Sequence, residues 1–180
     1  SNALKLKSLT KQGTKFCAVV KANAYGHGIC EAVNILKNTD VDFFAVASIY
    51  EAIHINPLVK KQPILILGGL FPGQESDVLE YQLTPVLYDL DCARRLDRAA
   101  RTAGCVVDYH LKVDTGMGRL GFRVDRLGEV LPVLKNLKNL KMAGLMSHLA
   151  VADEPERPLT AVQCDVFTRV VKAVEQAGFN

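Results

Sequence analysis

The chain has 180 residues, 49% of them hydrophobic and 23% charged, and this composition excludes a disordered or low-complexity protein. Its formal net charge of +3 is too small to indicate a nucleic-acid or membrane-surface partner. There is no apolar run of about 18 residues and no signal-peptide pattern, so we expect neither a membrane span nor secretion. The length fits a single domain over residues 1–180.

The cysteines point to a cytoplasmic protein. There are five, no two of them form a C-x-x-C pair, and each lies in an apolar pattern. Buried, reduced thiols are the expectation for such a set. The four histidines show no metal-ligand spacing, so we expect no bound metal.

Strand and helix patterns alternate along the chain. Short buried strands are predicted at residues 16–20, 43–48, 63–67, 84–88, 106–113 and 140–148. Helices are predicted at residues 29–36, 51–60, 74–81, 91–102, 125–137 and 160–176. Pro57 is expected to interrupt the second helix, Pro132 weakens the prediction of the fifth, and Gly104 suits a left-handed cap of the fourth.

Six such alternations predict an α/β fold with a parallel sheet and right-handed crossovers. A doubly wound sheet and a (β/α) barrel both fit the pattern. Lys21, Lys112 and His148 lie at the carboxyl ends of three different predicted strands. Because barrels collect their chemistry at that end, we expect a partial (β/α)8 TIM-type barrel with about six β/α units.

The most informative stretch is residues 16–28, FCAVVKANAYGHG. Its apolar run ends on Lys21, and a lysine at the mouth of a buried strand is poorly solvated, which favours the neutral amine that a Schiff base requires. The small residues and glycines that follow let a planar cofactor approach the backbone. The alternative is a strand-end lysine that reaches solvent beside an ordinary turn.

Residues 111–122, LKVDTGMGRLGF, form a second motif. Its glycines match the string G-x-G-x-x-G but lack the strand-to-helix context of a dinucleotide site, so we do not expect a nucleotide. Arg119 suits a carboxylate or phenolate oxygen, or it is a surface arginine. His148, in a third stretch, either contacts a cofactor or is structural.

These stretches, in this order, resemble alanine racemases, the fold-type III enzymes that depend on pyridoxal 5'-phosphate (PLP). The matching segments are AVVKANAYGHG at residues 18–28, PILILGG at 63–69, VDTGMGRLG at 113–121 and GLMSHLAVADEP at 144–155. The resemblance runs from about residue 15 to the end of the chain. It implies a cytoplasmic, homodimeric isomerase that interconverts L- and D-alanine and supplies D-alanine for peptidoglycan.

The resemblance also implies a role for each site residue. Lys21 would form the Schiff base with PLP and act as one of two catalytic bases, and Tyr25 would bind the cofactor phosphate. Arg119 would lie near the phenolic oxygen of PLP and the substrate carboxylate, and His148 would support the ring. Lys112 matches a lysine that is often carbamylated in the family and that positions this arginine.

Family barrels have eight strands and a separate β-domain that supplies the second base, a tyrosine. We count six strands, so we expect a truncated N-terminal barrel domain without the β-domain and without full activity. Incomplete sheet edges favour dimerisation. One alternative is a PLP homeostasis or carrier protein of the same barrel family, although those usually carry a different strand end. Another is a fold-type III decarboxylase, which shares Lys-Ala-Asn but not the segment at residues 114–119.

Overall fold

The computed structural model describes residues 2–59 and 61–179. The chain forms two compact units, Ser1–Pro85 and Val86–Asn180. In both units strands alternate with helices, and the strand pairings among the described residues are parallel. No helix within residues 2–59 and 61–179 is long and apolar enough to cross a membrane.

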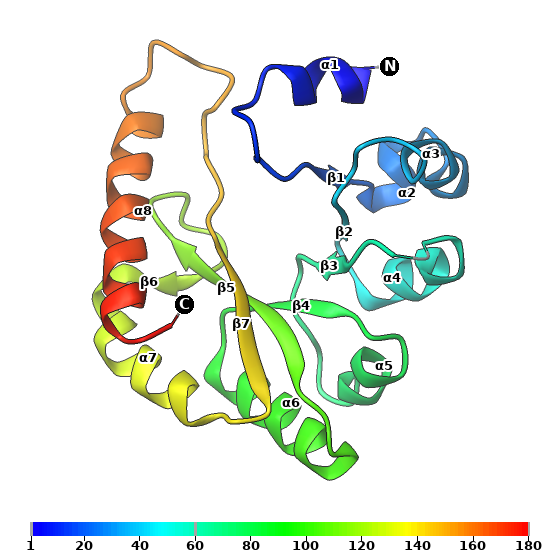
Figure 1. The fold of residues 1–180 in the computed structure, drawn as a ribbon. Helices are drawn as coiled ribbons and strands as arrows, with labels where there is room; N and C mark the ends of the chain where they lie inside the picture. The colour runs from blue at the N-terminus through cyan, green and yellow to red at the C-terminus, as the bar shows by residue number, and fades with distance from the viewer. Residues whose placement is uncertain (1, 60, 180) are drawn as a thin grey trace. The chain divides into compact units, whose positions relative to one another are not determined.

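The first unit carries three short strands, the start of a fourth, and the helices between them. Its strands are β1 Cys17–Val19, β2 Phe43–Val46, β3 Ile64–Ile66 and the first half of β4 Thr84–Leu87. Its helical segments are α1 Asn2–Ser8, α2 Lys21–Tyr25, α3 Ile29–Leu36, α4 Ile49–Ile55, the 3-10 turn η1 Asn56–Leu58 and α5 Glu75–Glu80. In Figure 1, α3, α4 and α5 lie on one side of strands β1 to β3.

The strands of the first unit form because their residues are apolar on both faces, as parallel strands covered by helices require. Ile64, Leu65 and Ile66 of β3 are all buried, and Phe44 of β2 is completely so. The register sets Ala45 opposite Val19 of β1 and Leu65 of β3. The carboxyl ends of β1, β2 and β3 therefore lie at the same edge of this unit.

The second unit contains the long strand β5 and the longer helices. Its elements are the second half of β4, α6 Leu90–Ala103, β5 Val107–Asp114, β6 Phe122–Arg123, the 3-10 turn η2 Val124–Arg126, α7 Leu127–Asn136, β7 Leu140–Met146 and α8 Leu159–Gln176. Strand β5 pairs with β4, β6 and β7. Figure 1 shows α7 and α8 on one side of β5 and β7.

Helix α6 begins and ends where the sequence indicates. Asp89 accepts a hydrogen bond from the backbone N–H of Cys92 at 2.7 Å, which caps the first turn. Gly104 ends the helix with φ at 67°, so the predicted left-handed cap is confirmed. The apolar face packs inward because its members recur at helical spacing: Cys92, Ala93, Leu96 and Ala100 are buried.

The two predicted helices that contain a proline differ in how they accommodate it. Helix α4 ends at Ile55, and Pro57 lies in the following 3-10 turn, so the predicted interruption is confirmed. Residue 60, the last of that predicted helix, lies outside the described residues. Pro132, in contrast, lies inside α7. Because proline has no N–H, one carbonyl near the start of the helix lacks its hydrogen-bond donor. The buried side chains of α7 offset that loss. These side chains are Leu127, Val130, Leu131 and Leu134.

The sequence patterns did not predict α1 or the two-residue strand β6, and they misjudged two cysteines. Cys105 and Cys164 are exposed, so the expectation of buried thiols is wrong for them. Cys105 lies in the link between α6 and β5, and Cys164 lies on α8 outside its buried residues. Cys92 is buried, and Cys17 and Cys30 are half-buried. All five cysteines are free thiols, in agreement with the expected reduced state.

Across the described residues the seven strands follow the order β1-β2-β3-β4-β5-β6, with β7 pairing β5. Apart from the short β6, neighbours in this order are joined by helical crossovers, which is the predicted α/β arrangement. The predicted site residues all follow or end strands of this sheet. Lys21 and Tyr25 belong to the first unit, and Lys112, Arg119 and His148 belong to the second.

Candidate active site

Lys21 opens a left-handed turn directly after β1. The four residues that follow it, Ala22, Asn23, Ala24 and Tyr25, all have φ between 51° and 55°. In this region an L-residue costs roughly 1–2 kcal/mol, so consecutive members persist only where other contacts hold them. The segment labelled α2 is therefore a strained left-handed turn and not a right-handed α-helix. The sequence patterns did not predict it.

Backbone and side-chain hydrogen bonds anchor this turn to the elements on either side. The N–H of Ala24 donates to the carbonyl of Val20 at 2.9 Å, and the N–H of Gly28 donates to that of Asn23 at 3.1 Å. The Asn23 side-chain Oδ1 accepts from the N–H of Ile29 at 2.8 Å, which ties the turn to the start of α3. Asn suits this position because its short amide tolerates the left-handed region.

The turn places its side chains in different environments. Lys21 is half-buried, whereas Ala24 is buried and Tyr25 is 61% exposed. The ring of His27 stays close to the turn, with Nδ1 at 3.0 Å from the carbonyl oxygen of Ala24. One short segment thus carries an amine at a strand end and an accessible phenol.

The carboxylate of Glu51 contacts the same turn from α4. Its Oε1 accepts a hydrogen bond from the N–H of Ala22 at 2.7 Å. Its Oε2 accepts from the N–H of Ala47 at 2.7 Å and from that of Ser48 at 3.2 Å, just beyond the end of β2. Ser48 and Glu51 form the capping box of α4, which begins two residues before the predicted start of this helix, whereas the contact of Glu51 with Ala22 has no local sequence signal.

In the second unit, Asp114 organises the glycine loop that carries Arg119. Its carboxylate accepts hydrogen bonds from the N–H groups of Gly116 at 2.9 Å and of Gly118 at 2.9 and 3.1 Å. Partial burial acts to raise the pKa of Asp114, but these donors and the charge of Lys112 outweigh it, so the pKa lies below its ordinary value. Arg119 is exposed on this loop.

Gly121 closes the loop against β5. Its φ is 133°, and a Cβ there would lie 2.5 Å from the backbone nitrogen of Asp114. Only glycine fits such an approach. Gly121 therefore lets the chain return to the sheet at β6.

Gln163 of α8 joins the Asp114 loop to the end of β7. Its side chain is completely buried. The amide Nε2 donates to Thr115 Oγ1 at 3.2 Å and to the carbonyl of His148 at 2.9 Å, and Oε1 accepts from the N–H of Ala150 at 2.9 Å. The sequence signal for Gln163 is a polar residue on the inward face of an amphipathic helix, a pattern that does not name its partners.

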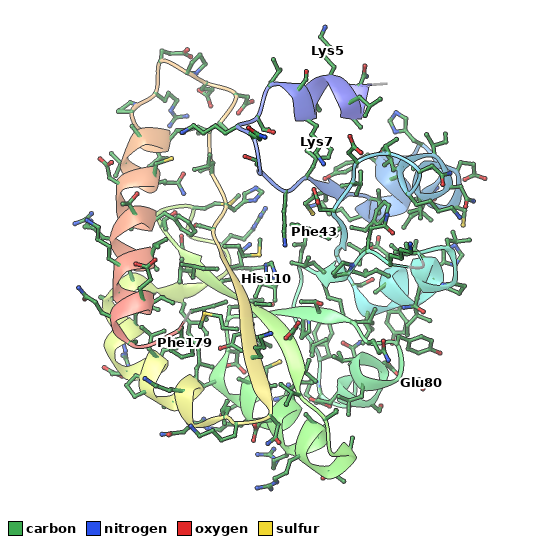
Figure 2. All side chains as sticks on the ribbon, viewed as in Figure 1. Lys5, Lys7, Phe43, Glu80, His110 and Phe179 are labelled. Atoms are coloured by element: carbon green, nitrogen blue, oxygen red, sulfur yellow. The ribbon has the colours of Figure 1, made fainter. Side chains whose placement is uncertain are left out.

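The remaining predicted residues lie at the same end of neighbouring strands. Lys112 is buried in β5 at 5% exposure, in register with Met146 of β7, and His148 follows β7 with its side chain exposed. Two residues before Lys112, the His110 ring (Figure 2) packs against Gly144, where a Cβ would lie 2.5 Å from the ring. Burial lowers the pKa of His110, although the charge of Asp108 acts in the opposite direction.

Comparison with known proteins identifies relatives over the whole chain. The family model described as "Alanine racemase, N-terminal domain" matches residues 1–180. An alanine racemase of Geobacter sp. (strain M21) is 40% identical over 173 residues, which cover 93% of this chain and 46% of that protein. One of Symbiobacterium thermophilum is 35% identical over 178 residues, covering 99% and 47%. The chain thus spans about half the length of these curated relatives.

Solved structures agree with this relationship. The alanine racemase of Clostridium difficile 630 in complex with cycloserine has a TM-score of 0.93 and 30% identity, covering 99% of this chain and 50% of that one. The alanine racemase of Bartonella henselae with covalently bound pyridoxal phosphate has a TM-score of 0.85 at 24% identity, which supports the fold. The N-terminal domains of these neighbours are TIM-type barrels, so the predicted fold class is confirmed.

Replacing Gln163 tests whether the buried amide holds the loop and the end of β7 together. We expect Gln163→Leu to lower the free energy of unfolding by about 2–4 kcal/mol, because buried polar groups of Thr115, His148 and Ala150 lose this partner. Gln176→Leu, at an exposed position of the same helix, is the matched control and should stay within about 0.5 kcal/mol. Denaturant titration measures both, and equal effects would contradict the role of Gln163.

The lowered pKa of Asp114 predicts a pH-dependent contribution to stability. The folded pKa lies below the ordinary value of 3.8, so the contribution is complete above that pH and is lost as the pH falls through the folded pKa. We expect Asp114→Asn to cost about 1 kcal/mol at pH 7 and progressively less in acid. Unfolding titrations between neutral and acid pH measure the difference. Asp165→Asn, exposed on α8, is the control, and a difference that does not change with pH would refute the assignment.

Proposed function

The chain belongs to the alanine racemase N-terminal-domain family, whose members depend on PLP, and we propose that its residues bind this cofactor through Lys21. The observation that carries the proposal is the position of Lys21, which follows the carboxyl end of β1 and opens a turn of small residues. An amine at that position suits the aldehyde of PLP, and the alanines beside it leave the backbone accessible.

The chemistry of the other residues fits the same cofactor. The exposed phenol of Tyr25 is a hydrogen-bond donor for the phosphate. In the second unit, Arg119 offers a guanidinium for the phenolic oxygen or a substrate carboxylate, and His148 offers a ring and a polar nitrogen. We propose these roles, together with carbamylation of the buried Lys112, which would convert a cation into an anion beside the loop that carries Arg119.

We propose racemisation of alanine as the reaction of the enzyme that contains this chain. The bound cofactor supplies an electron sink for the pair left when the α-proton is removed. Lys21 would take and return that proton on one face of alanine, as a general base with a nearby donor atom does. The names of the relatives support alanine as substrate, with D-alanine production for peptidoglycan, a cytoplasmic location and a homodimer as the further parts of the proposal.

Covalent trapping tests the role of Lys21. After incubation with PLP and reduction with borohydride, we expect mass spectrometry to find the pyridoxyl label on Lys21 before other lysines. Lys21→Ala should abolish that label, whereas Lys15→Ala, at an exposed position just before β1, should leave it unchanged. Labelling spread evenly over the exposed lysines would refute a specific site.

A racemase assay tests a second expectation, that residues 1–180 alone lack full activity. Inversion requires a proton donor on the face of alanine opposite Lys21. The resemblance to alanine racemases assigns that donor to a tyrosine of another domain. With added PLP we therefore expect no L- to D-alanine conversion at the rate of a full-length racemase, measured by chiral chromatography. Conversion at that rate would place both bases within residues 1–180.

A further inference from the structure

We propose that Glu51 is a positioning residue that fixes the backbone of Lys21 through the N–H of Ala22. The effect of Glu51 on the capture of PLP rests on the proposed function, whereas its effect on the backbone does not. Its structural basis is the pair of carboxylate oxygens, of which Oε1 accepts from Ala22 at 2.7 Å and Oε2 accepts from Ala47 at 2.7 Å. One side chain thereby joins the turn after β1 to the end of β2.

The hydrogen bond from Ala22 acts on Lys21 because of peptide geometry. The N–H of Ala22 and the carbonyl of Lys21 belong to one planar peptide unit. Holding that N–H therefore fixes the rotation of the backbone at Lys21 and the direction in which its side chain leaves β1. The preceding contact, from the N–H of Val20 to the carbonyl of Ala45 at 2.8 Å, fixes only the end of the strand ladder.

The turn needs such an external contact because its own conformation is unfavourable. Ala22 is the first of four consecutive residues with φ near +50°, and alanine gains nothing in the left-handed region to offset the cost. A carboxylate that accepts backbone N–H groups forms stronger hydrogen bonds than a neutral acceptor. Glu51 therefore stabilises the turn at the residue next to the catalytic amine.

The competing explanation is that Glu51 serves only the capping box of α4. In that motif the N–H of Glu51 donates to Ser48 Oγ at 3.4 Å, and the Glu51 carboxylate accepts from the N–H of Ser48. Ser48→Ala removes the serine side chain from the box but keeps the carboxylate near Ala22. The two explanations therefore make different predictions for variants at residues 48 and 51.

The decisive variant is Glu51→Gln, which keeps the size of the side chain and removes one acceptor. An amide has a single acceptor oxygen, so its NH₂ group must face either Ala22 or the N–H groups of Ala47 and Ser48. Glu51→Asp keeps the charge but is one methylene shorter and cannot reach both strand ends. It provides a second test if the glutamine variant folds poorly.

The first measurement is amide hydrogen exchange by NMR in the chain without cofactor. We expect Glu51→Gln and Glu51→Asp to raise the exchange rate of Ala22 about tenfold relative to the amide of Val20 as internal reference. Glu51→Gln removes the charge of the acceptor in either orientation of its amide, and Glu51→Asp shortens the side chain. Ser48→Ala should leave that ratio unchanged, although it lowers the melting temperature. An unchanged ratio in both Glu51 variants, or an equal rise in Ser48→Ala, would overturn the proposal.

The second measurement is PLP titration with borohydride trapping at Lys21. We expect about tenfold weaker capture in the Glu51 variants and unchanged capture in Ser48→Ala. Wild-type-like capture in the Glu51 variants would overturn the effect on Lys21. If the unaltered chain does not label at Lys21, the proposed cofactor site fails, while the exchange of Ala22 still decides whether Glu51 positions the turn.

Discussion

The candidate site depends on a left-handed turn that the chain adopts directly after its first strand. Four residues in a region disfavoured for L-amino acids follow Lys21, and hydrogen bonds to the neighbouring elements offset the cost of this conformation. Asn23 connects the turn to α3, Glu51 connects it to β2 and α4, and Val20 connects it to β1. The hydrogen bonds thus hold the backbone at Lys21. This matters because the lysine side chain itself is long and flexible.

The second unit solves a similar problem with glycines and buried polar groups. The loop after β5 must turn sharply to bring β6 back beside it, and Gly121 allows the approach that any Cβ would block. Asp114 satisfies the N–H groups that the loop exposes, and Gln163 satisfies groups at the end of β7. Because these acceptors and donors are internal, the guanidinium of Arg119 and the ring of His148 face outward from a fixed backbone.

Sequence patterns predicted most of the fold because the strands are short apolar runs and the helices carry one apolar stripe. They located Lys21, Lys112 and His148 at strand ends for the same reason. The left-handed turn escaped prediction because Lys-Ala-Asn-Ala-Tyr contains no glycine, and its single asparagine is only a weak signal of positive φ. Glu51 and Gln163 escaped because their partners are distant in sequence, at 29 and up to 48 positions. Such contacts leave no periodic pattern, and only the folded chain places them together.

The left-handed turn also restricts which residue types can occupy positions 22–25. Side chains branched at Cβ clash with their own backbone at positive φ, so valine, isoleucine and threonine are poorly tolerated at positions 22–25. Glycine would relax the strain, yet it would also release the chain to many other conformations. Few residue types are therefore tolerated at the positions beside Lys21, because of the backbone conformation alone. Differences in the substrates that such a site binds must therefore arise from residues outside the turn.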